Sequence, residues 1–487
     1  MKVLSIKTNY ILNVFRVISG AAVGLVTMPY INRVIGAEYI GKVEYVNTII
    51  NYFLLFSALG IPMYGIREIS KVRDNPQKKA KTLAELLIIL GFTSLIGYLL
   101  LFGVLYNLNY FNSYKSLILI MSSMIFLTNI GAEWYFQGIE DQLYITLRYV
   151  GVRIIMVVLM LLFIKSPQDY NFYAFCIVLT TCGANFLNFF VISKVVLKER
   201  KWLWESLNIK RHMKPVLTIF VATISVNIYL QLDYLLIGSI ASDKYVGYYS
   251  IANKLVRFVI GFITVIGAVM LPRLSFLFQN DKEQYFIYLQ RTFTILLLIS
   301  LPFTIYFLVF AKPIINLIAG KEFVASILTM RLISPLCIIV SMAYFMGFLI
   351  LYPQNREKIY TFATIISAVF SIGVNFYAIN KYQHNGAAVV GVLAEFIAIV
   401  IMFLYLKKNS ILPNLFDANF FKIVVSGLIM FFSSIIGIYF FEDNLTNFIV
   451  LTLLCWVVYV IALVLIKEQE FNEIFIKLLR RTLKKNN

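Results

Sequence analysis

Apolar runs of about 18 residues or more recur from the beginning of the chain almost to its end. Each run is about long enough to cross a hydrocarbon core of ~30 Å as a helix. Charged residues make up only 14% of the chain, against about 25% in soluble domains, and the mean hydropathy is +0.83. The chain is therefore predicted to be an all-α integral membrane protein.

Polar breaks divide the apolar sequence into about fourteen predicted transmembrane helices. No soluble domain of ordinary size fits between them. The predicted helices are residues 9–35, 39–65, 82–106, 115–137, 141–164, 171–195, 214–240, 245–275, 289–311, 325–352, 358–379, 385–407, 418–441 and 446–466.

The basic residues of the connecting loops predict the orientation. If the N-terminus is inside, about 29 Lys and Arg residues fall on the inner side and about 8 on the outer side. Both termini are therefore predicted to be cytoplasmic. Because the basic residues are dispersed over short loops, the net charge of +19 reflects topology and inner-leaflet attraction, and nucleic acid is not an expected partner.

The C-terminal segment carries apolar residues at helical spacing with basic residues beside them. We expect an amphipathic helix on the anionic inner leaflet. The alternative is a solvated tail whose basic residues only reflect the general excess of Lys and Arg on the cytoplasmic side. The apolar residues are Phe471, Ile474, Phe475 and Leu478.

Six cationic side chains lie inside the predicted spans. At a helix centre each one opposes insertion by roughly 2.5–3.5 kcal/mol, so we expect them to face a wet or protein-lined interior. A positively charged interior favours a negatively charged cargo. Arg331, near the start of its span, has the alternative of extending to the membrane interface. The six are Arg16, Arg148, Arg153, Lys254, Arg257 and Arg331.

Polar residues inside four spans recur at spacings that place them on one helix face, as a hydrophilic cavity needs. Hydrogen bonding between helices, without a cavity, is the alternative for any single stripe. The stripes are Asn9, Asn13, Arg16 and Gly20; Glu44, Asn47 and Asn51; Asn227, Gln231 and Tyr234; and Asn253, Lys254 and Arg257.

A short internal repeat indicates two related halves. An acid, an aromatic residue, an aliphatic residue and a glycine follow in order after the first and the seventh predicted helices, in residues 35–41 and 240–247. We therefore predict two six-helix bundles, with a substrate site at the interface between the halves. The predicted boundaries are 1–200 and 201–410 for the bundles, 411–466 for two extra helices and 467–487 for the tail.

Several motifs resemble those of O-antigen and capsule repeat-unit flippases, the Wzx-like polysaccharide transporters. The resemblance covers about residues 1–410 and is most specific in the string Trp134-Tyr135-Phe136-Gln137-Gly138. Further matching segments are Gly65 to Ile69, Leu232-Asp233, Val246 to Lys254, and Asn385 to Ala388 with Glu395.

The resemblance implies the fold of the multidrug, oligosaccharidyl-lipid and polysaccharide exporter superfamily, two six-helix bundles as in the multidrug (MATE) exporters, and an alternating-access mechanism. It also implies a cargo of undecaprenyl-diphosphate-linked oligosaccharide, moved from the inner to the outer leaflet of the bacterial cytoplasmic membrane, with membrane lipids and a polysaccharide polymerase as partners. Arginine and lysine suit diphosphate oxygens. We expect Arg16, Arg148, Arg153, Lys254 and Arg257 to hold the headgroup, and Asn13, Asn47, Asn51, Asn227 and Gln231 to line the glycan path.

The energy source is expected to be an ion gradient, because no nucleotide-binding motif of the G-x-x-x-x-G-K-[ST] type occurs. The candidate coupling carboxylates are Glu44, Asp233 and Glu395, since burial can raise the pKa of an acid enough for it to exchange a proton. The alternative for each is a salt bridge to a cation of the interior. No cofactor and no metal site is expected, because the four cysteines all fall inside spans and the two histidines in separate loops.

Three rival functions remain open. A drug exporter of the same superfamily would favour an acidic or apolar pocket, and a lipid II flippase would differ mainly in the glycan. A membrane glycosyltransferase or polymerase would need a large outer loop, whereas every predicted outer loop is shorter than about 15 residues. We therefore expect a transporter and no enzyme.

Overall fold

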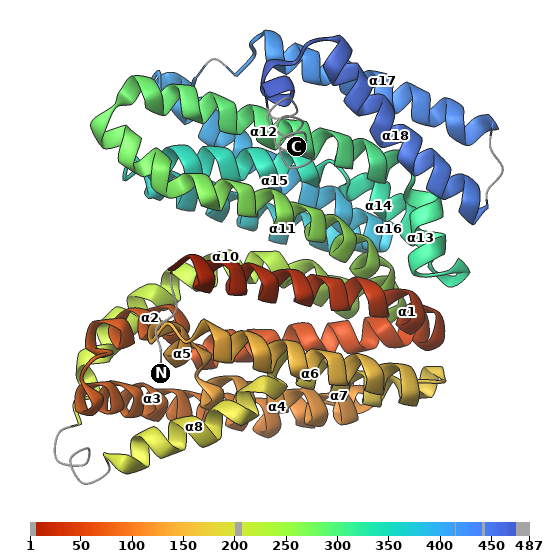
Figure 1. Cartoon of the computed structure of the whole chain (residues 1–487). Coiled ribbons are helices and arrows are strands. Elements are labelled where there is room, and N and C mark those ends of the chain that lie inside the picture. The colour runs from red at the N-terminus through yellow and green to blue at the C-terminus, as the bar shows by residue number, and fades with distance from the viewer. Residues whose placement is uncertain (1–5, 200–206, 414, 441–443, 474–487) are drawn as a thin grey trace, which may run out of the picture. The chain divides into compact units, whose positions relative to one another are not determined.

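The computed structural model describes residues 6–199, 207–413, 415–440 and 444–473, and the secondary structure of this part of the chain is helical throughout (Figure 1). The chain forms two compact units, Met1–Gly247 and Tyr248–Asn487. The division of the chain at residues 200 and 410 stays a prediction.

The first unit is built around α1, which packs against α3, α4, α6 and α10. The short helix α5 packs mainly on α2. The elements of this unit are α1 (Ile6–Ala58), α2 (Ile61–Val72), α3 (Pro76–Gly103), η1 (Leu105–Asn107), η2 (Asn109–Tyr114), α4 (Lys115–Gly131), α5 (Glu133–Gly138), α6 (Gln142–Phe163), η3 (Pro167–Asp169), α7 (Tyr170–Val178), the π-helix η4 (Leu179–Gly183), α8 (Ala184–Lys198) and α10 (Lys210–Ile240).

The helix α11 (Asp243–Asn280) begins at the end of the first unit and continues into the second. In the second unit α12 packs against α15 and α17, α16 against α14 and α15, and α17 against α18. The other elements are α12 (Lys282–Val309), α13 (Ala311–Ile318), η5 (Lys321–Phe323), α14 (Ser326–Ile333), α15 (Leu336–Tyr344), the π-helix η6 (Phe345–Leu351), α16 (Glu357–Lys408), α17 (Ala418–Phe440) and α18 (Leu445–Leu465).

The count of spans agrees with the prediction. Eleven helical stretches among the described residues are long and apolar enough to cross a membrane. Two of them, the stretches that lie mostly in α1 and in α16, each correspond to two predicted spans. The boundary between the two spans is a kink inside the helix, at Gly36 in α1 and at Gln383 in α16. With both halves of these helices and with α10, whose 31 residues are also long enough, the total is the expected fourteen.

The second predicted helix ends earlier than expected. The prediction extended it to residue 65, but α1 ends at Ala58. Leu59 and Gly60 have φ angles of 46° and 73°, a left-handed conformation that helices do not continue through. The chain then restarts as α2, an amphipathic helix with Pro62 in its first turn.

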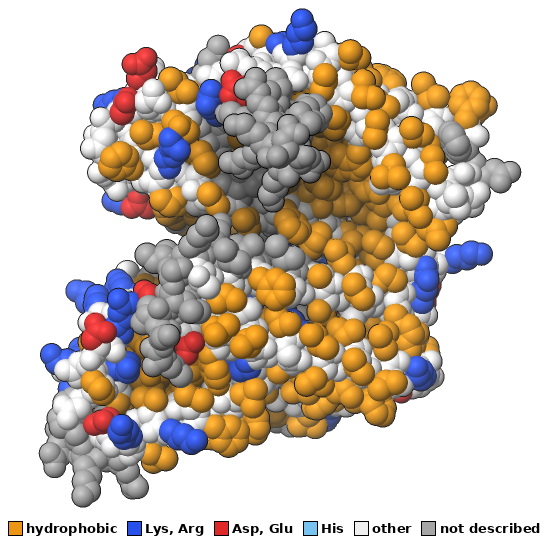
Figure 2. All heavy atoms as spheres, viewed as in Figure 1, with side chains coloured by type: hydrophobic (Ala, Val, Ile, Leu, Met, Phe, Trp, Pro, Cys, Tyr) orange, Lys and Arg blue, Asp and Glu red, His pale blue; other side chains and the backbone are white. Residues whose placement is uncertain are grey.

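The outside of both units is apolar, as a lipid-facing surface requires. Large hydrophobic side chains are exposed along the spans, for example Leu99 on α3, Phe163 on α6, Phe432 on α17 and Leu453 on α18. Figure 2 shows hydrophobic side chains over much of the visible face of each unit, while Lys and Arg gather mostly towards helix ends. The chain is therefore a multi-pass membrane protein.

Side-chain caps mark several helix starts. Asn75 accepts a hydrogen bond from the Lys78 backbone N–H at 3.0 Å, and Asp281 accepts one from Gln284 at 3.0 Å. Such caps satisfy N–H groups that have no partner inside the helix. Both residues lie at helix ends, where the sequence also places its breaks between spans.

The first residues of the predicted tail are attached to the second unit. Arg291 of α12 forms ion pairs with Glu470 at 3.1 Å and with Glu473 at 3.9 Å. The carboxylate of Glu468 is fully buried and accepts the backbone N–H of Phe471 at 2.6 Å. Burial raises the pKa of Glu468 above its usual range. The rest of the amphipathic segment, from Ile474 onward, lies outside the described residues.

The two copies of the internal repeat contact each other through their backbones. A Cβ atom on Gly41 would lie 1.7 Å from the carbonyl oxygen of Asp243, and one on Gly247 would lie 2.0 Å from that of Ala37. No side chain can occupy either space unless the backbone moves. The glycines that identified the repeat therefore permit this close approach.

Replacing Gly41 by alanine is expected to destabilise the protein by about 1–3 kcal/mol, because the added methyl group meets backbone atoms that cannot rotate away. Gly91→Ala is the matched control. A Cβ at Gly91 meets nothing within 4 Å, so this change should be neutral or stabilising by up to about 1 kcal/mol. Melting temperatures in detergent compare the two variants, and equal effects would contradict the close approach.

Candidate substrate-binding site

Three arginines gather where α1 packs along α6. Arg16 lies on α1, and Arg148 and Arg153 lie on α6. Arg16 and Arg153 both face the ring of Tyr149, with distances from the guanidinium carbon to the ring centroid of 5.6 Å and 3.8 Å. Residues far apart in the sequence thus form one cationic cluster.

Arg16 is neutralised by an acid. Its Nη1 forms an ion pair with Oε1 of Glu133, and its Nη2 donates to Oδ1 of Asn13 at 3.1 Å. Gln137 donates to the same Glu133 oxygen at 3.0 Å. The Arg16 and Glu133 side chains are 18% and 25% exposed, so this ion pair is partly shielded from solvent.

The resemblance motif positions this acid. The ring of Trp134 lies against Gly65 of α2, where a Cβ would come within 2.4 Å of it. A Cβ on Gly138 would lie 2.8 Å from the side chain of Ile69. These two contacts fix α5 on α2, while Glu133 and Gln137, four residues apart, share the face that meets Arg16. The apolar motif residues are therefore structural, and the polar ones contact the cationic cluster.

Arg153 occupies a space that a glycine leaves free. A Cβ on Gly20 of α1 would lie 1.8 Å from Nη1 of Arg153. Nη2 of Arg153 donates to the hydroxyl of Tyr149, whereas Nε and Nη1 have no hydrogen-bond partner within the described part of the chain. Gly20 was expected on the polar face of its helix, and its role is to admit this guanidinium.

Arg148 is the most deeply buried of the three. Its residue is 7% exposed, and none of its three guanidinium nitrogens has a hydrogen-bond partner among the described residues. The guanidinium faces the rings of Tyr144 at 5.0 Å and Phe136 at 5.7 Å. Cation–π contacts compensate only part of the cost of burying such a charge.

The described cluster therefore has surplus positive charge. Three guanidinium groups share one carboxylate, Glu133, and five nitrogens on Arg148 and Arg153 are unsatisfied. Buried polar groups are normally hydrogen-bonded, and exceptions often mark a functional site. An anion with several oxygens, such as a diphosphate, supplies the acceptors that these nitrogens need.

The predicted cations of the second unit are placed separately. Lys254 and Arg257 are half-buried on α11, and Nε of Arg257 donates to Oδ1 of Asn253 at 3.1 Å. Arg331 is exposed on α14, and its position at the membrane interface stays a prediction. The assignment of Lys254 and Arg257 to the headgroup stays a prediction.

The remaining predicted site residues lie on α1, α10 and α16. Asn47 and Gln231 each carry a buried side-chain oxygen without a hydrogen-bond partner in the described residues, as expected of polar groups that line a ligand path. Glu44 is buried, while Asn51, Asp233 and Glu395 are half-buried. The side chains of Asn9 and Asn227 lie outside the described set.

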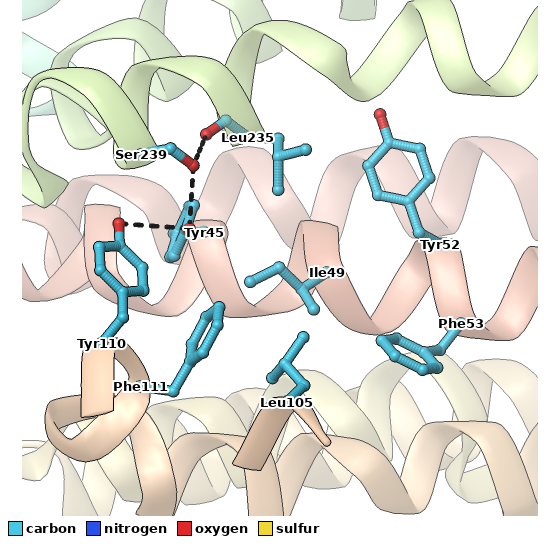
Figure 3. A pocket seen from close by; sticks show the side chains of 9 residues that line it. All are labelled: Tyr45, Ile49, Tyr52, Phe53, Leu105, Tyr110, Phe111, Leu235 and Ser239. Atoms are coloured by element: carbon cyan, nitrogen blue, oxygen red, sulfur yellow. Dashed lines mark hydrogen bonds between the residues drawn. The ribbon is translucent and has the colours of Figure 1, made fainter. Parts of the chain in front are cut away.

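Sequence reasoning did not anticipate an aromatic cavity of about 420 Å³ in the first unit (Figure 3). Inside it the hydroxyl of Tyr45 lies 3.1 Å from that of Ser239 and 3.4 Å from that of Tyr110. Its lining contains no charged side chain, so it suits a neutral group better than a phosphate. The lining residues are Tyr45, Ile49, Tyr52, Phe53, Leu105, Tyr110, Phe111, Leu235 and Ser239.

A second unanticipated feature is a buried acid that joins α2, α3 and α10. Glu85 on α3 is fully buried and accepts hydrogen bonds from Arg211 at 2.5 Å, from His212 at 2.9 Å and from the Asn208 backbone N–H at 2.6 Å. The other ring nitrogen of His212 lies 2.8 Å from the Tyr64 hydroxyl. This network fixes the start of α10.

The sequence as a whole matches a known family. The model of the family described as polysaccharide biosynthesis protein matches residues 6–278, which is more than half of the chain. The chain belongs to the polysaccharide biosynthesis protein family. The family of the lipid II flippase MurJ matches residues 150–459, also more than half, so the chain belongs to this family as well.

Relatives of this family agree with the resemblance that the motifs indicated, which is thereby confirmed. The chain is 22% identical over 394 residues to a protein of Escherichia coli K12 named as a candidate O-antigen transporter, covering 80% of this chain and 93% of that protein. A protein of Shigella dysenteriae with the same name is 23% identical, over 77% of this chain and 94% of its own length.

Solved structures show the same fold as this family member. The lipid II flippase MurJ in an inward closed conformation aligns with a TM-score of 0.72 and 18% identity over 96% of this chain and 99% of its own. An inward-facing MATE multidrug resistance transporter of the MOP superfamily aligns with a TM-score of 0.58 and 13% identity, over 83% and 95%. The expected fold class is confirmed.

Proposed function

We propose that this protein is a flippase that moves polyprenyl-diphosphate-linked oligosaccharide repeat units from the inner to the outer leaflet of the bacterial cytoplasmic membrane. The observation that carries the proposal is a pair of arginines, the buried Arg148 and the half-buried Arg153, in a member of the polysaccharide biosynthesis family. Five of their six guanidinium nitrogens lack an acceptor among the described residues. A diphosphate supplies those acceptors.

The proposed roles of the site residues rest on their charge, their polarity and their place on the helices. Arg148 and Arg153 bind phosphate oxygens, and Arg16 joins them when its carboxylate partner is displaced. Asn13, Asn47, Asn51, Asn227 and Gln231 line the glycan path, and Lys254 and Arg257 of the second unit contribute further cations. The protein moves its cargo by alternating access and catalyses no covalent step. Both termini are cytoplasmic, and a polysaccharide polymerase receives the cargo.

Among related cargoes we favour the repeat unit of a surface polysaccharide over lipid II. The relatives named for O-antigen transport are covered over 93% and 94% of their lengths, and the polysaccharide biosynthesis model covers the first unit with its cationic cluster. A cationic drug is disfavoured by the charge of that cluster. Glu44, Asp233 and Glu395 stay the proposed ion-coupling carboxylates.

Leaflet exchange in proteoliposomes tests the proposal. The vesicles contain a fluorescent polyprenyl-diphosphate oligosaccharide, and a membrane-impermeant enzyme that attacks the glycan reports the fraction in the outer leaflet. We expect the parent protein to expose the inner pool much faster than vesicles without protein. Exchange of lipid II at the same or a higher rate would favour the rival cargo, and no exchange of any diphosphate-linked lipid would contradict the proposed function.

A further inference from the structure

The ion pair between Arg16 and Glu133 separates one arginine of the cationic cluster from the other two. Arg148 and Arg153 carry guanidinium N–H groups without an acceptor among the described residues, whereas Arg16 donates to Glu133 and Asn13. A diphosphate that binds Arg16 through the same Nη1–Nη2 edge replaces the carboxylate of Glu133 there. Substrate and carboxylate are thus alternative partners of the same guanidinium group.

The structure holds the backbone of Glu133 beside the cationic cluster. It is the first residue of α5, directly after Ala132 with its left-handed φ of 36°, and α5 is held on α2 by the close contacts of Trp134 and Gly138. Gln137 also holds the carboxylate at 3.0 Å. After displacement, the acid therefore stays beside the diphosphate.

We propose that the diphosphate of the cargo displaces Glu133 from Arg16, and that Glu133 then takes up one proton. This inference rests on the proposed function. In the binding step the salt bridge between Arg16 and Glu133 breaks, the Arg16 N–H groups donate to phosphate oxygens, and a proton from water binds a carboxylate oxygen of Glu133. Release of the cargo returns the proton to water and re-forms the salt bridge.

The charges around Glu133 explain why a proton follows. A carboxylate that loses its guanidinium partner and gains an anionic neighbour in a partly shielded site favours its neutral form. The other groups near it cannot supply the pH dependence between pH 5 and 8, because arginine stays protonated and tyrosine and buried cysteine titrate at higher pH. These groups are Arg16 on α1, Arg148, Arg153, Tyr144 and Tyr149 on α6, and Cys182 on η4.

The charged residues of α2, the helix on which α5 packs, have partners of their own. Glu68 pairs with Arg67 at 3.2 Å and with Lys71 at 2.8 Å on the exposed side of that helix. The histidine of the first unit, His212, is held by Glu85 and Tyr64 in the network at the start of α10. Glu133 is therefore the acid whose surroundings change most when an anion binds to the cationic cluster.

The direction of the pH effect follows from linkage. The complex binds more protons than the free protein, so affinity must rise as pH falls, by up to about tenfold per pH unit for the uptake of one proton. The proton also travels with the cargo. Moving a doubly negative diphosphate outward with one proton transfers one net negative charge, which an inside-negative membrane potential favours by roughly 2.3 kcal/mol per 100 mV.

The test measures binding of a short polyprenyl-diphosphate-N-acetylglucosamine to the purified full chain in detergent, from about pH 5.5 to about pH 8.5. The diphosphate diester of this probe does not titrate in that range. Calorimetry in buffers of different ionisation enthalpy counts the protons taken up. For the parent protein we expect rising affinity at lower pH and uptake approaching one proton.

Glu133→Gln is the decisive variant, because glutamine cannot be protonated and holds Arg16 only weakly. It should bind the probe as tightly at high pH as the parent does at low pH, with proton uptake near zero. Glu140→Gln is the matched control, because Glu140 follows the same short helix but pairs with Arg73 at the exposed end. This change should leave the proton uptake and the pH dependence of probe binding as they are in the parent.

The outcomes separate this inference from the proposed function. Tight binding of the probe with a pH-independent affinity in the parent, or unchanged proton uptake in Glu133→Gln, would overturn the exchange at Arg16 and leave the flippase proposal standing. No binding in the parent at any pH would overturn both. If Glu133→Gln does not fold, infrared difference spectra of the parent decide, since the probe must produce a protonated-carboxyl band.

Discussion

Replacing Arg148 by glutamine is expected to abolish transport while leaving the protein as stable as before or more stable. The guanidinium is 7% exposed and has no hydrogen-bond partner among the described residues, so its charge opposes folding and its removal relieves that cost. Each charge-assisted hydrogen bond to the cargo contributes about 1.5–3 kcal/mol, and losing two should reduce affinity at least 100-fold.

Two measurements on the same preparation check this expectation: the leaflet-exchange rate in proteoliposomes and the melting temperature in detergent. Arg73→Gln is the control, because Arg73 lies at an exposed end and pairs with Glu140 at 2.8 Å. It should change neither quantity much. A destabilised Arg148→Gln variant that still transports would show that Arg148 is a structural residue and would remove the main support for the diphosphate site.

Replacing Glu85 by alanine is expected to have the largest effect on stability, about 3–5 kcal/mol. The carboxylate is fully buried and joins Arg211, His212 and the Asn208 backbone. Without it, the buried His212 loses a hydrogen-bond partner, the exposed Arg211 and the Asn208 N–H lose theirs, and the start of α10 loses its attachment to α3. Glu85→Gln should cost less, because the amide keeps an acceptor oxygen.

Glu68→Gln is the matched control for this second prediction. Glu68 also pairs with two basic residues, but those partners, Arg67 and Lys71, are 55% and 58% exposed, and such surface pairs contribute about 0–1 kcal/mol. Yield of folded protein and melting temperature in detergent compare the three variants. Similar losses for Glu85→Ala and Glu68→Gln would contradict a structural role specific to the buried network.

The fold was largely predictable from the sequence, and the reason is physical. A membrane requires about 20 apolar residues for each helical crossing, so apolar runs and polar breaks indicate the spans directly. The kinks at Gly36 and Gln383 lie close to the predicted breaks between spans. The turn at Leu59 and Gly60 was missed because it interrupts no apolar pattern: a left-handed conformation depends on local backbone geometry.

The candidate site was predictable only in part. The spacing of Asn13, Arg16 and Gly20 correctly places these residues on one face, because helical periodicity fixes which residues share a side. The partner of Arg16 lies 117 residues away, and no local pattern connects the two. Glu133 directly precedes the resemblance motif of residues 134–138, and this position was the available signal.

By itself, the sequence determined that the chain is a membrane protein of about fourteen helices, that it belongs to a polysaccharide transport family, and that cations lie within its spans. Only the tertiary structure decided which of those cations are neutralised. Hydropathy and charge act residue by residue and can be read along the chain. Whether a buried charge is satisfied depends on the groups that packing brings within about 3 Å. Among the described residues, packing placed a carboxylate at Arg16 but none at Arg148 or Arg153.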